Sequence, residues 1–167
     1  MYESEAEIED GIEEIAMPWV HNDGGFSESG LTNRGRRKHG SPVVAAIAIA
    51  EQRRYSEVYY ELRTLQWDFT MRARSKRKQE HSGDPHHGVF VEVFKPYLLA
   101  RGWLWTPTMG VGTGVTMHLD YEEVPDLPLL IARISKSLVT VINGVAQYTH
   151  DPSRDGRRAL YGYFQPR

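Results

Sequence analysis

The stretch KHGSPVVAAIAIAEQ, residues 38–52, predicts a helix that is apolar on nearly all sides. Ser41 followed by Pro42 is a helix-start signal. The serine hydroxyl accepts a backbone N–H of the first turn, and proline lacks only an N–H that would be unpaired there. The apolar residues that follow are Val43, Val44, Ala46, Ile47, Ala48 and Ile49. A helix without a polar face is buried, so we expect this one at the centre of the molecule.

After this central helix the sequence predicts two more helices. The second starts near Ser56, and spacings of four, three and four residues place its apolar side chains on one face. These side chains are Val58, Leu62, Leu65 and Phe69. The third covers residues 89–100 and ends before Gly102, which favours a helix stop. Pro96 inside it predicts a kink or an early end, because proline removes one intrahelical hydrogen bond.

The second half of the chain is rich in strand patterns. Four segments have them: residues 106–119 (TPTMGVGTGVTMHL), 127–135 (LPLLIARIS), 138–150 (LVTVINGVAQYTH) and 157–164 (RRALYGYF). The third of these contains Asn143-Gly144, the strongest short-range hairpin signal, and therefore reads as two strands. Helices followed by strands predict an α+β fold, in which N-terminal helices pack on a small antiparallel β-sheet.

The composition is that of a single globular domain. The 167 residues fit one domain, and no apolar run approaches the roughly 20 residues that span a membrane. The absence of cysteine excludes disulfides, thiolate metal sites and a cysteine nucleophile, and it fits a reducing cytoplasm. Residues 1–14 hold seven acidic residues and no basic one, which is unlike a secretory or transit peptide. We expect an acidic, flexible extension at residues 1–17 and one α+β domain at residues 18–167.

Two basic clusters are the candidate binding surface. They consist of Arg34, Arg36, Arg37 and Lys38, and of Arg72, Arg74, Lys76, Arg77 and Lys78. A basic helix end is also explained by the helix dipole alone. As a binding surface, the second cluster would contact an acidic protein, or it would neutralise phosphates while Trp67 stacks on bases. The acidic strip at residues 1–14 is either solvated or folds over this basic surface.

Histidines raise the question of a metal site. His86 and His87 could join His118 and Asp120, since imidazole and carboxylate suit zinc, manganese or non-haem iron. Their spacing matches no recognised metal signature, and loop histidines beside Asp-Pro are typical of turns. The glycines of MGVGTGV, residues 109–115, precede no helix and so do not predict a phosphate loop. We expect no metal and no cofactor.

Several blocks of the chain resemble a family of small phage and prophage proteins with a papain-like, C39-type cysteine-peptidase fold. The blocks are WVHNDGG, SPVVAAIAIAEQRRYSEVYYEL, LLARGWLWTPTM, MHL and VINGVAQYTHDPSRDGRRALYGYF. Together they cover about residues 19–164 and are distinctive in combination. The resemblance implies a papain-like arrangement of the α+β fold and a cytoplasmic location in a bacterial host.

The resemblance also implies where a catalytic site would lie. Pro42 stands at the position of the cysteine, Ser137 at that of the histidine base, and Asp151 at that of the acid that orients the base. Ala45 replaces the arginine that usually follows the cysteine. Nucleophile and base are therefore both lost, and only the acid remains. This pattern predicts a pseudoenzyme without catalytic residues.

Three functional interpretations remain open at this stage. The first is a non-catalytic phage-type protein that binds a host or phage macromolecule, a protein rather than a nucleic acid, for instance as an inhibitor of a host defence or regulatory complex. The second is a hydrolase rebuilt around Ser41, His118, His150 and Asp151. The third is a nucleic-acid-binding module that uses the basic clusters. We expect the first, with no membrane partner, and the sequence does not fix the oligomeric state.

Overall fold

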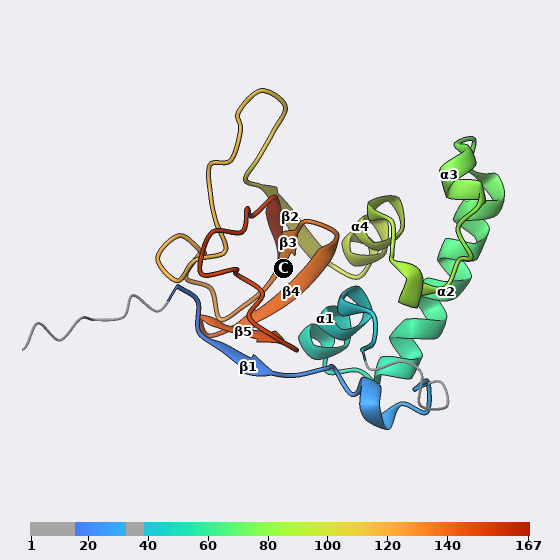
Figure 1. The fold of residues 1–167 in the computed structure, drawn as a ribbon, viewed down its shortest axis with the longest axis horizontal. Coiled ribbons are helices and arrows are strands. Elements are labelled where there is room, and N and C mark those ends of the chain that lie inside the picture. The colour runs from blue at the N-terminus through green and yellow to red at the C-terminus, as the bar shows by residue number, and fades with distance from the viewer. Residues whose placement is uncertain (1–15, 33–38) are drawn as a thin grey trace, which may run out of the picture.

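A computed structural model describes residues 16–32 and 39–167 of the chain. The acidic strip at residues 1–14 lies outside the described residues, and so does the first basic cluster of Arg34, Arg36, Arg37 and Lys38. The fold is α+β, as predicted, with the helices gathered on one side of a β-sheet (Figure 1). None of the helices in the described part of the chain is long and apolar enough to cross a membrane.

The central helix is α1, Pro42–Glu51, and it begins where the sequence predicts. The Ser41 hydroxyl accepts the backbone N–H of Val44 at 3.3 Å, so Ser41 is the N-cap and Pro42 the first helical residue. Six of the ten helical residues are buried: Val43, Val44, Ala46, Ile47, Ala48 and Ala50. Thr140 of the sheet donates a hydrogen bond of 2.6 Å to the Ala46 carbonyl, which ties the buried helix to the strand beneath it.

Helix α2, Tyr55–Arg72, packs against α1 and is followed by the single turn α3, Lys76–Gln79. The prediction for its apolar face is wrong at Leu65, which is 46% exposed. Gln66 occupies the fully buried position instead. Its side-chain NH₂ group donates hydrogen bonds to the carbonyls of Gly83 and Gly88, and its side-chain oxygen accepts one from the Phe90 N–H. A polar residue can replace an apolar one here because all its donors and acceptors are used.

Helix α4, Val91–Ala100, lies between α2 and the sheet. It contains Pro96 and continues for four residues beyond it, so the early end predicted from this proline is not observed. Val93 and Tyr97, about one helical turn apart, are buried together with Phe94 and Leu98.

The sheet has six strands in the order β1-β5-β4-β3-β6-β2. The strands are β1 (Trp19–His21), β2 (Trp103–Pro107), β3 (Leu129–Ile134), β4 (Ser137–Ile142), β5 (Val145–Tyr148) and β6 (Gly162–Pro166). The expectation of an antiparallel sheet is wrong at one edge, because β1 runs parallel to β5. The sequence does not predict this strand because it has only three residues, all of them exposed.

Two local strand predictions have opposite outcomes. Asn143 and Gly144 join β4 and β5 as predicted, with φ angles of 49° and 78° that suit a type I′ turn. By contrast, most of residues 106–119 is not strand. Only its first two residues belong to β2, and residues 108–118 form a loop that extends from the body of the molecule (Figure 1). Its glycines weaken strand formation, and a single bridge joins His118 to Ala159.

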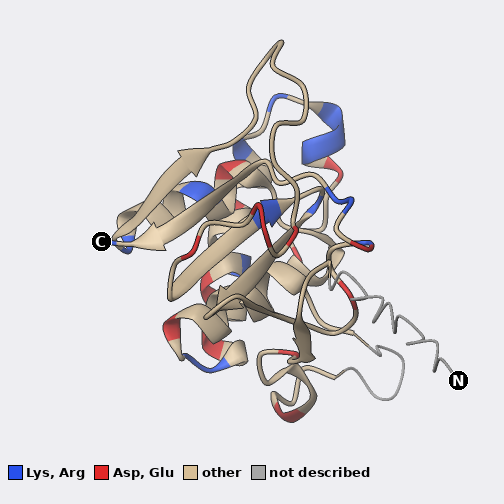
Figure 2. Ribbon diagram, turned by 90° about the vertical axis from the view of Figure 1, so that its left-hand side faces the viewer, with Lys and Arg blue, Asp and Glu red and all other residues tan. Residues whose placement is uncertain are grey.

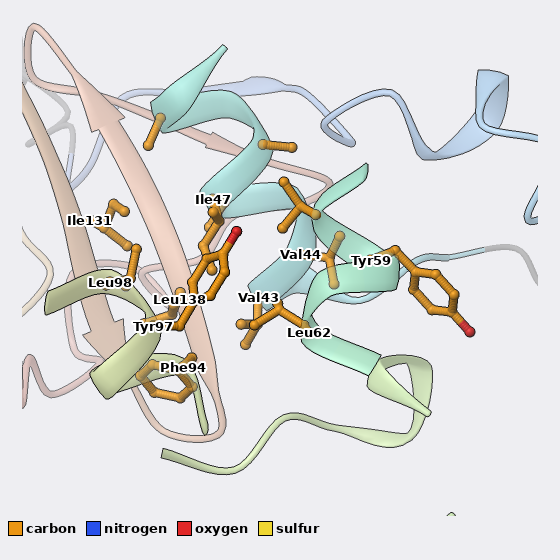
Figure 3. Close-up of a cluster of buried hydrophobic side chains, with 14 of the residues drawn as sticks. Val43, Val44, Ile47, Tyr59, Leu62, Phe94, Tyr97, Leu98, Ile131 and Leu138 are labelled. Atoms are coloured by element: carbon orange, nitrogen blue, oxygen red, sulfur yellow. The ribbon is translucent and has the colours of Figure 1, made fainter. Parts of the chain in front are cut away.

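Apolar residues fill both faces of the sheet. One core lies between the sheet and the helices, where Ile131 and Leu138 meet Ile47 of α1 and Leu98 of α4 (Figure 3). The second core lies on the opposite face, built from alternate strand residues and from Leu119 and Leu160 of the covering loops. Burial on both faces explains why β3 and β4 are nearly continuous apolar runs.

Candidate functional site

A cavity of about 250 Å³ lies at the N-terminus of α1, and we call it the α1 cavity. It is lined by Asn22, Asp23, His39, Gly40, Ser41, Pro42, Ala45, Tyr148, Thr149 and His150. The cavity thus joins the loop after β1, the start of α1 and the end of β5. The resemblance to papain-like peptidases implies a nucleophile at this helix start, at the position of Pro42.

The Ser41 hydroxyl is committed to the helix. The residue is only 2% exposed, and its oxygen caps the Val44 N–H. Its own backbone N–H donates to the Tyr55 hydroxyl at 2.8 Å. Since Pro42 offers no reactive atom, the helix start presents no free nucleophile to the cavity.

Ser137, at the implied position of the base, is also a structural residue. It is 6% exposed, and its hydroxyl lies 2.9 Å from the hydroxyl of Tyr148. Tyr148 lines the α1 cavity, so Ser137 supports the cavity wall from behind rather than facing the cavity. A serine hydroxyl at this place accepts no proton at neutral pH, so it supplies no general base.

Asp151, at the implied position of the orienting acid, holds a turn. Its carboxylate accepts hydrogen bonds from the Ser153 N–H at 2.9 Å, the Ser153 hydroxyl at 2.7 Å and the Asp155 N–H at 3.3 Å. Burial raises the pKa of Asp151, but these hydrogen bonds outweigh it and lower the pKa below its usual value. The carboxylate is therefore ionised and already satisfied within its own loop.

The alternative hydrolase set is only partly brought together. Ser41 and His150 line the same cavity, but His118 does not. The His118 ring instead lies 3.1 Å from the carboxylate of Glu123. Asp23, part of the WVHNDGG block but not among the predicted site residues, also lines the cavity. Its carboxylate accepts hydrogen bonds from Gly25 and Ser27 and so holds the loop.

The histidines weighed as metal ligands also lie apart. His86 is stacked on Tyr59 with ring centroids 4.6 Å apart, and its Nε2 is 2.9 Å from the Tyr55 hydroxyl. Its surroundings are thus aromatic and distinct from those of His118. Within residues 16–32 and 39–167, no group of three or more histidine and carboxylate side chains is arranged to hold a metal ion.

The second basic cluster borders a groove of about 690 Å³ between α3, the N-terminus of α4 and the β3–β4 turn. We call it the α3–α4 groove. It is lined by Ser75, Arg77, Lys78, Glu80, His81, His87, Gly88, Val89, Phe90, Val91, Glu92, Arg133 and Lys136. Of the predicted cluster, Arg77 and Lys78 line the groove, and the lysine and arginine residues of α3 form a blue block in Figure 2.

The groove combines positive charge with an apolar wall. Four of its lining residues are lysine or arginine and two are glutamate. Lys78 pairs with Glu92 at 2.8 Å, which lowers the pKa of Glu92. Lys78 also lies 5.6 Å from the ring centroid of Phe69, which packs on Phe90. Phe69 thus packs within the protein, in agreement with its place on the predicted apolar face, whereas Trp67 is 57% exposed.

Sequence reasoning missed Arg133 and Lys136 because they are far from the cluster in the chain. Arg133 lies in β3 and Lys136 in the β3–β4 turn, and the packing of the sheet against α4 brings them to the groove. Of the remaining cluster members, Arg72 pairs with Asp68 at 3.3 Å and Lys76 with Glu80 at 3.9 Å, both on the surface. Surface pairs of this kind contribute little to stability, so these cations stay available to a partner.

No protein-family model, curated protein or solved structure matches this chain.

Proposed function

We propose that this protein is a non-catalytic binding protein that holds an acidic segment of a partner protein in the α3–α4 groove. The observation that carries the proposal is the groove itself. Its cations come from two segments far apart in sequence, with Arg77 and Lys78 on α3 and Arg133 and Lys136 beside the β3–β4 turn. They surround a wall formed by the residues that lead into α4.

The lining of the groove favours a protein over a nucleic acid as partner. Its wall includes Val89, Phe90 and Val91, which suit an apolar side chain set among acidic ones. Glu80 and Glu92 interrupt its positive charge, so the groove suits acidic side chains spaced along a peptide better than a continuous phosphate backbone. A mixed surface of this kind selects its partner by charge complementarity and packing together.

The α1 cavity supports the non-catalytic part of the proposal. The serines at positions 41 and 137 and the carboxylate of Asp151 each have hydrogen-bond partners that account for them structurally. In the context of the resemblance to phage and prophage proteins with a papain-like fold, the proposed role is inhibition of a host defence or regulatory complex. The bacterial cytoplasm is the proposed location.

The test is affinity capture from bacterial lysate with a tagged chain, in nuclease-treated and untreated halves. We compare the wild type with the double variant Arg77→Glu/Lys136→Glu, because both residues are exposed and line the groove. The matched control is Arg63→Glu/Arg167→Glu, which reverses the same charge at two exposed residues outside the groove.

We expect a stoichiometric protein partner that survives nuclease, is retained by the control and is lost with the groove variant. Equal capture by the groove variant would remove the groove from the proposal. A partner set that disappears on nuclease treatment would replace it with nucleic-acid binding. Capture of no partner by the wild type would contradict a binding function.

A further inference from the structure

A third concave site lies beside the β3–β4 turn, and three of its lining residues are arginines. This cavity of about 360 Å³ is lined by Ser135, Arg154, Arg157, Arg158, Ala159 and Tyr161. We call it the arginine cavity. Its lining shares no residue with the α1 cavity or the α3–α4 groove, so an inference drawn from it does not depend on the proposed function.

The guanidinium of Arg158 is held by backbone carbonyls rather than by a carboxylate. One terminal nitrogen donates to the Ser135 carbonyl at 2.8 Å and the other to the Pro152 carbonyl at 3.5 Å. Its Nε is buried and has no hydrogen-bond partner in the described structure. Burial lowers the pKa of Arg158, and the neighbouring charge of Arg154 lowers it further. Both effects are those of a cation without a counter-ion.

Acidic side chains do not balance the charge of the cavity. Within the described parts of the chain, Arg157 pairs with Asp155 at 3.8 Å, and both of these side chains are more than 80% exposed. Neither Arg154 nor Arg158 has a carboxylate within 4.0 Å in that same region. Three arginines therefore line one cavity, and in the described parts of the chain a single weak surface ion pair offsets their positive charge.

The loop that carries the arginines is held in a conformation that most residues avoid. Arg154 and Asp155 both have left-handed backbones, with φ angles of 52° and 57°. The Asp151 carboxylate accepts hydrogen bonds from the Ser153 and Asp155 N–H groups, and the hydroxyl of the fully buried Ser153 accepts one from the Gly156 N–H. These bonds hold the turn. Such strain persists where the surrounding structure enforces it, and it is found preferentially at functional sites.

We propose that the arginine cavity binds a phosphate monoester. Guanidinium groups match the oxygens of a phosphate, and a dianion offsets several converging positive charges better than a single carboxylate does. The cavity has the volume of roughly a dozen waters at about 30 Å³ each, so it accommodates a group attached to the phosphate. Tyr161 also lines the cavity, so we expect it to contact this attached group.

The test is calorimetric titration of the full chain with inorganic phosphate, adenosine monophosphate and a 5′-phosphorylated dinucleotide, with acetate at equal ionic strength as the control anion. Arg154→Gln is the main variant, because Arg154 is exposed and its side chain makes no hydrogen bond or ion pair within the described structure. Arg63→Gln, at an exposed arginine of α2, is the matched control.

We expect a phosphate monoester to bind more tightly than inorganic phosphate, and acetate to give no saturable heat. Arg154→Gln should weaken binding about tenfold, the loss of one charge-assisted interaction, while Arg63→Gln leaves it unchanged. The two phosphate esters separate a free nucleotide from the end of a nucleic acid as the source of the phosphate.

Three results would overturn the proposal: no saturable phosphate binding by the wild type, equal binding by Arg154→Gln, or equal heats from acetate. Arg158→Gln adds a further check when its phosphate affinity and thermal unfolding are measured together. If this variant unfolds at lower temperature but binds phosphate normally, the arginine has a structural role only and the cavity is not the proposed site.

Discussion

The backbone N–H of Ser41 donates a hydrogen bond of 2.8 Å to the hydroxyl of Tyr55, and both residues are buried. The same hydroxyl lies 2.9 Å from Nε2 of His86, in the short helix η2, Pro85–His87. Tyr55 thus connects the residue that starts α1 with α2 and with the loop that precedes α4. The N-terminus of α1, where the resemblance implies a nucleophile, is therefore held by hydrogen bonds of both Ser41 and Tyr55.

Tyr55→Phe tests how much this connection contributes to stability. The substitution keeps the ring and leaves the buried Ser41 N–H without its acceptor, so we expect the free energy of unfolding to fall by about 1–3 kcal/mol in urea titrations. Tyr60→Phe is the control, since Tyr60 is 51% exposed, and it should change stability by no more than about 0.5 kcal/mol. Equal effects of the two substitutions would contradict a special role for Tyr55.

Substitutions of Ser41 distinguish a helix-capping role of this residue from a nucleophilic one. Ser41→Ala removes the acceptor for Val44 and should destabilise the protein by about 1 kcal/mol, whereas Ser41→Gly should cost only a few tenths, as is typical of N-cap positions. A serine-directed fluorophosphonate probe should leave the wild type unlabelled because the hydroxyl is buried. Labelling of the wild type that disappears in Ser41→Ala would restore the hydrolase interpretation.

The fold was predictable wherever the signal is local. The cap at Ser41 and the turn at Asn143-Gly144 depend on a few neighbouring residues, and both predictions are confirmed. The edge strand β1 was not predictable, because a three-residue exposed strand has no apolar alternation. Leu65 was misassigned since a helical period alone does not reveal that Gln66 is fully satisfied by three backbone groups.

The candidate sites, too, were predictable only where the signal is local. The cluster on α3 is visible as a run of basic letters, but Arg133 and Lys136 reach the groove only through sheet packing. The arginines of the third cavity are adjacent in sequence, yet their common orientation depends on a left-handed turn and on Ser135 of another segment. Contacts between distant segments of the chain carry no local pattern, so a single sequence does not reveal them.

Glu61 should make stability depend on pH in the acidic range. Its carboxylate accepts hydrogen bonds from Arg53 at 2.7 Å and from the Tyr97 hydroxyl at 2.5 Å. Burial raises the pKa of Glu61, but these bonds outweigh it and hold the pKa below its ordinary value of 4.5. A carboxylate whose pKa is lower in the folded state stabilises the protein at pH values above its unfolded-state pKa. This contribution disappears as the pH falls through the folded-state pKa.

Urea unfolding of wild type and Glu61→Gln between pH 3 and pH 7 measures this effect. The difference in unfolding free energy should be constant above about pH 4.5 and should shrink below it, as the wild-type carboxylate becomes protonated. Glu122→Gln, at an exposed loop residue, is the control and should show no such convergence. A difference between wild type and Glu61→Gln that grows at low pH would contradict the sign argued here.

Gly162 tests the close approach of β6 to β2. A Cβ atom at this position would overlap the indole ring of Trp105 and lie 2.7 Å from the Thr106 carbonyl oxygen, closer than real contacts allow. Gly162→Ala should therefore lower the free energy of unfolding by about 1–3 kcal/mol, measured by urea titration, because the strand pair must separate. Gly110→Ala is the matched control, since its Cβ would meet only Thr113 at 3.9 Å, and it should stay within about 0.5 kcal/mol of the wild type. If both variants were as stable as the wild type, the strands would not approach each other as closely as this register requires.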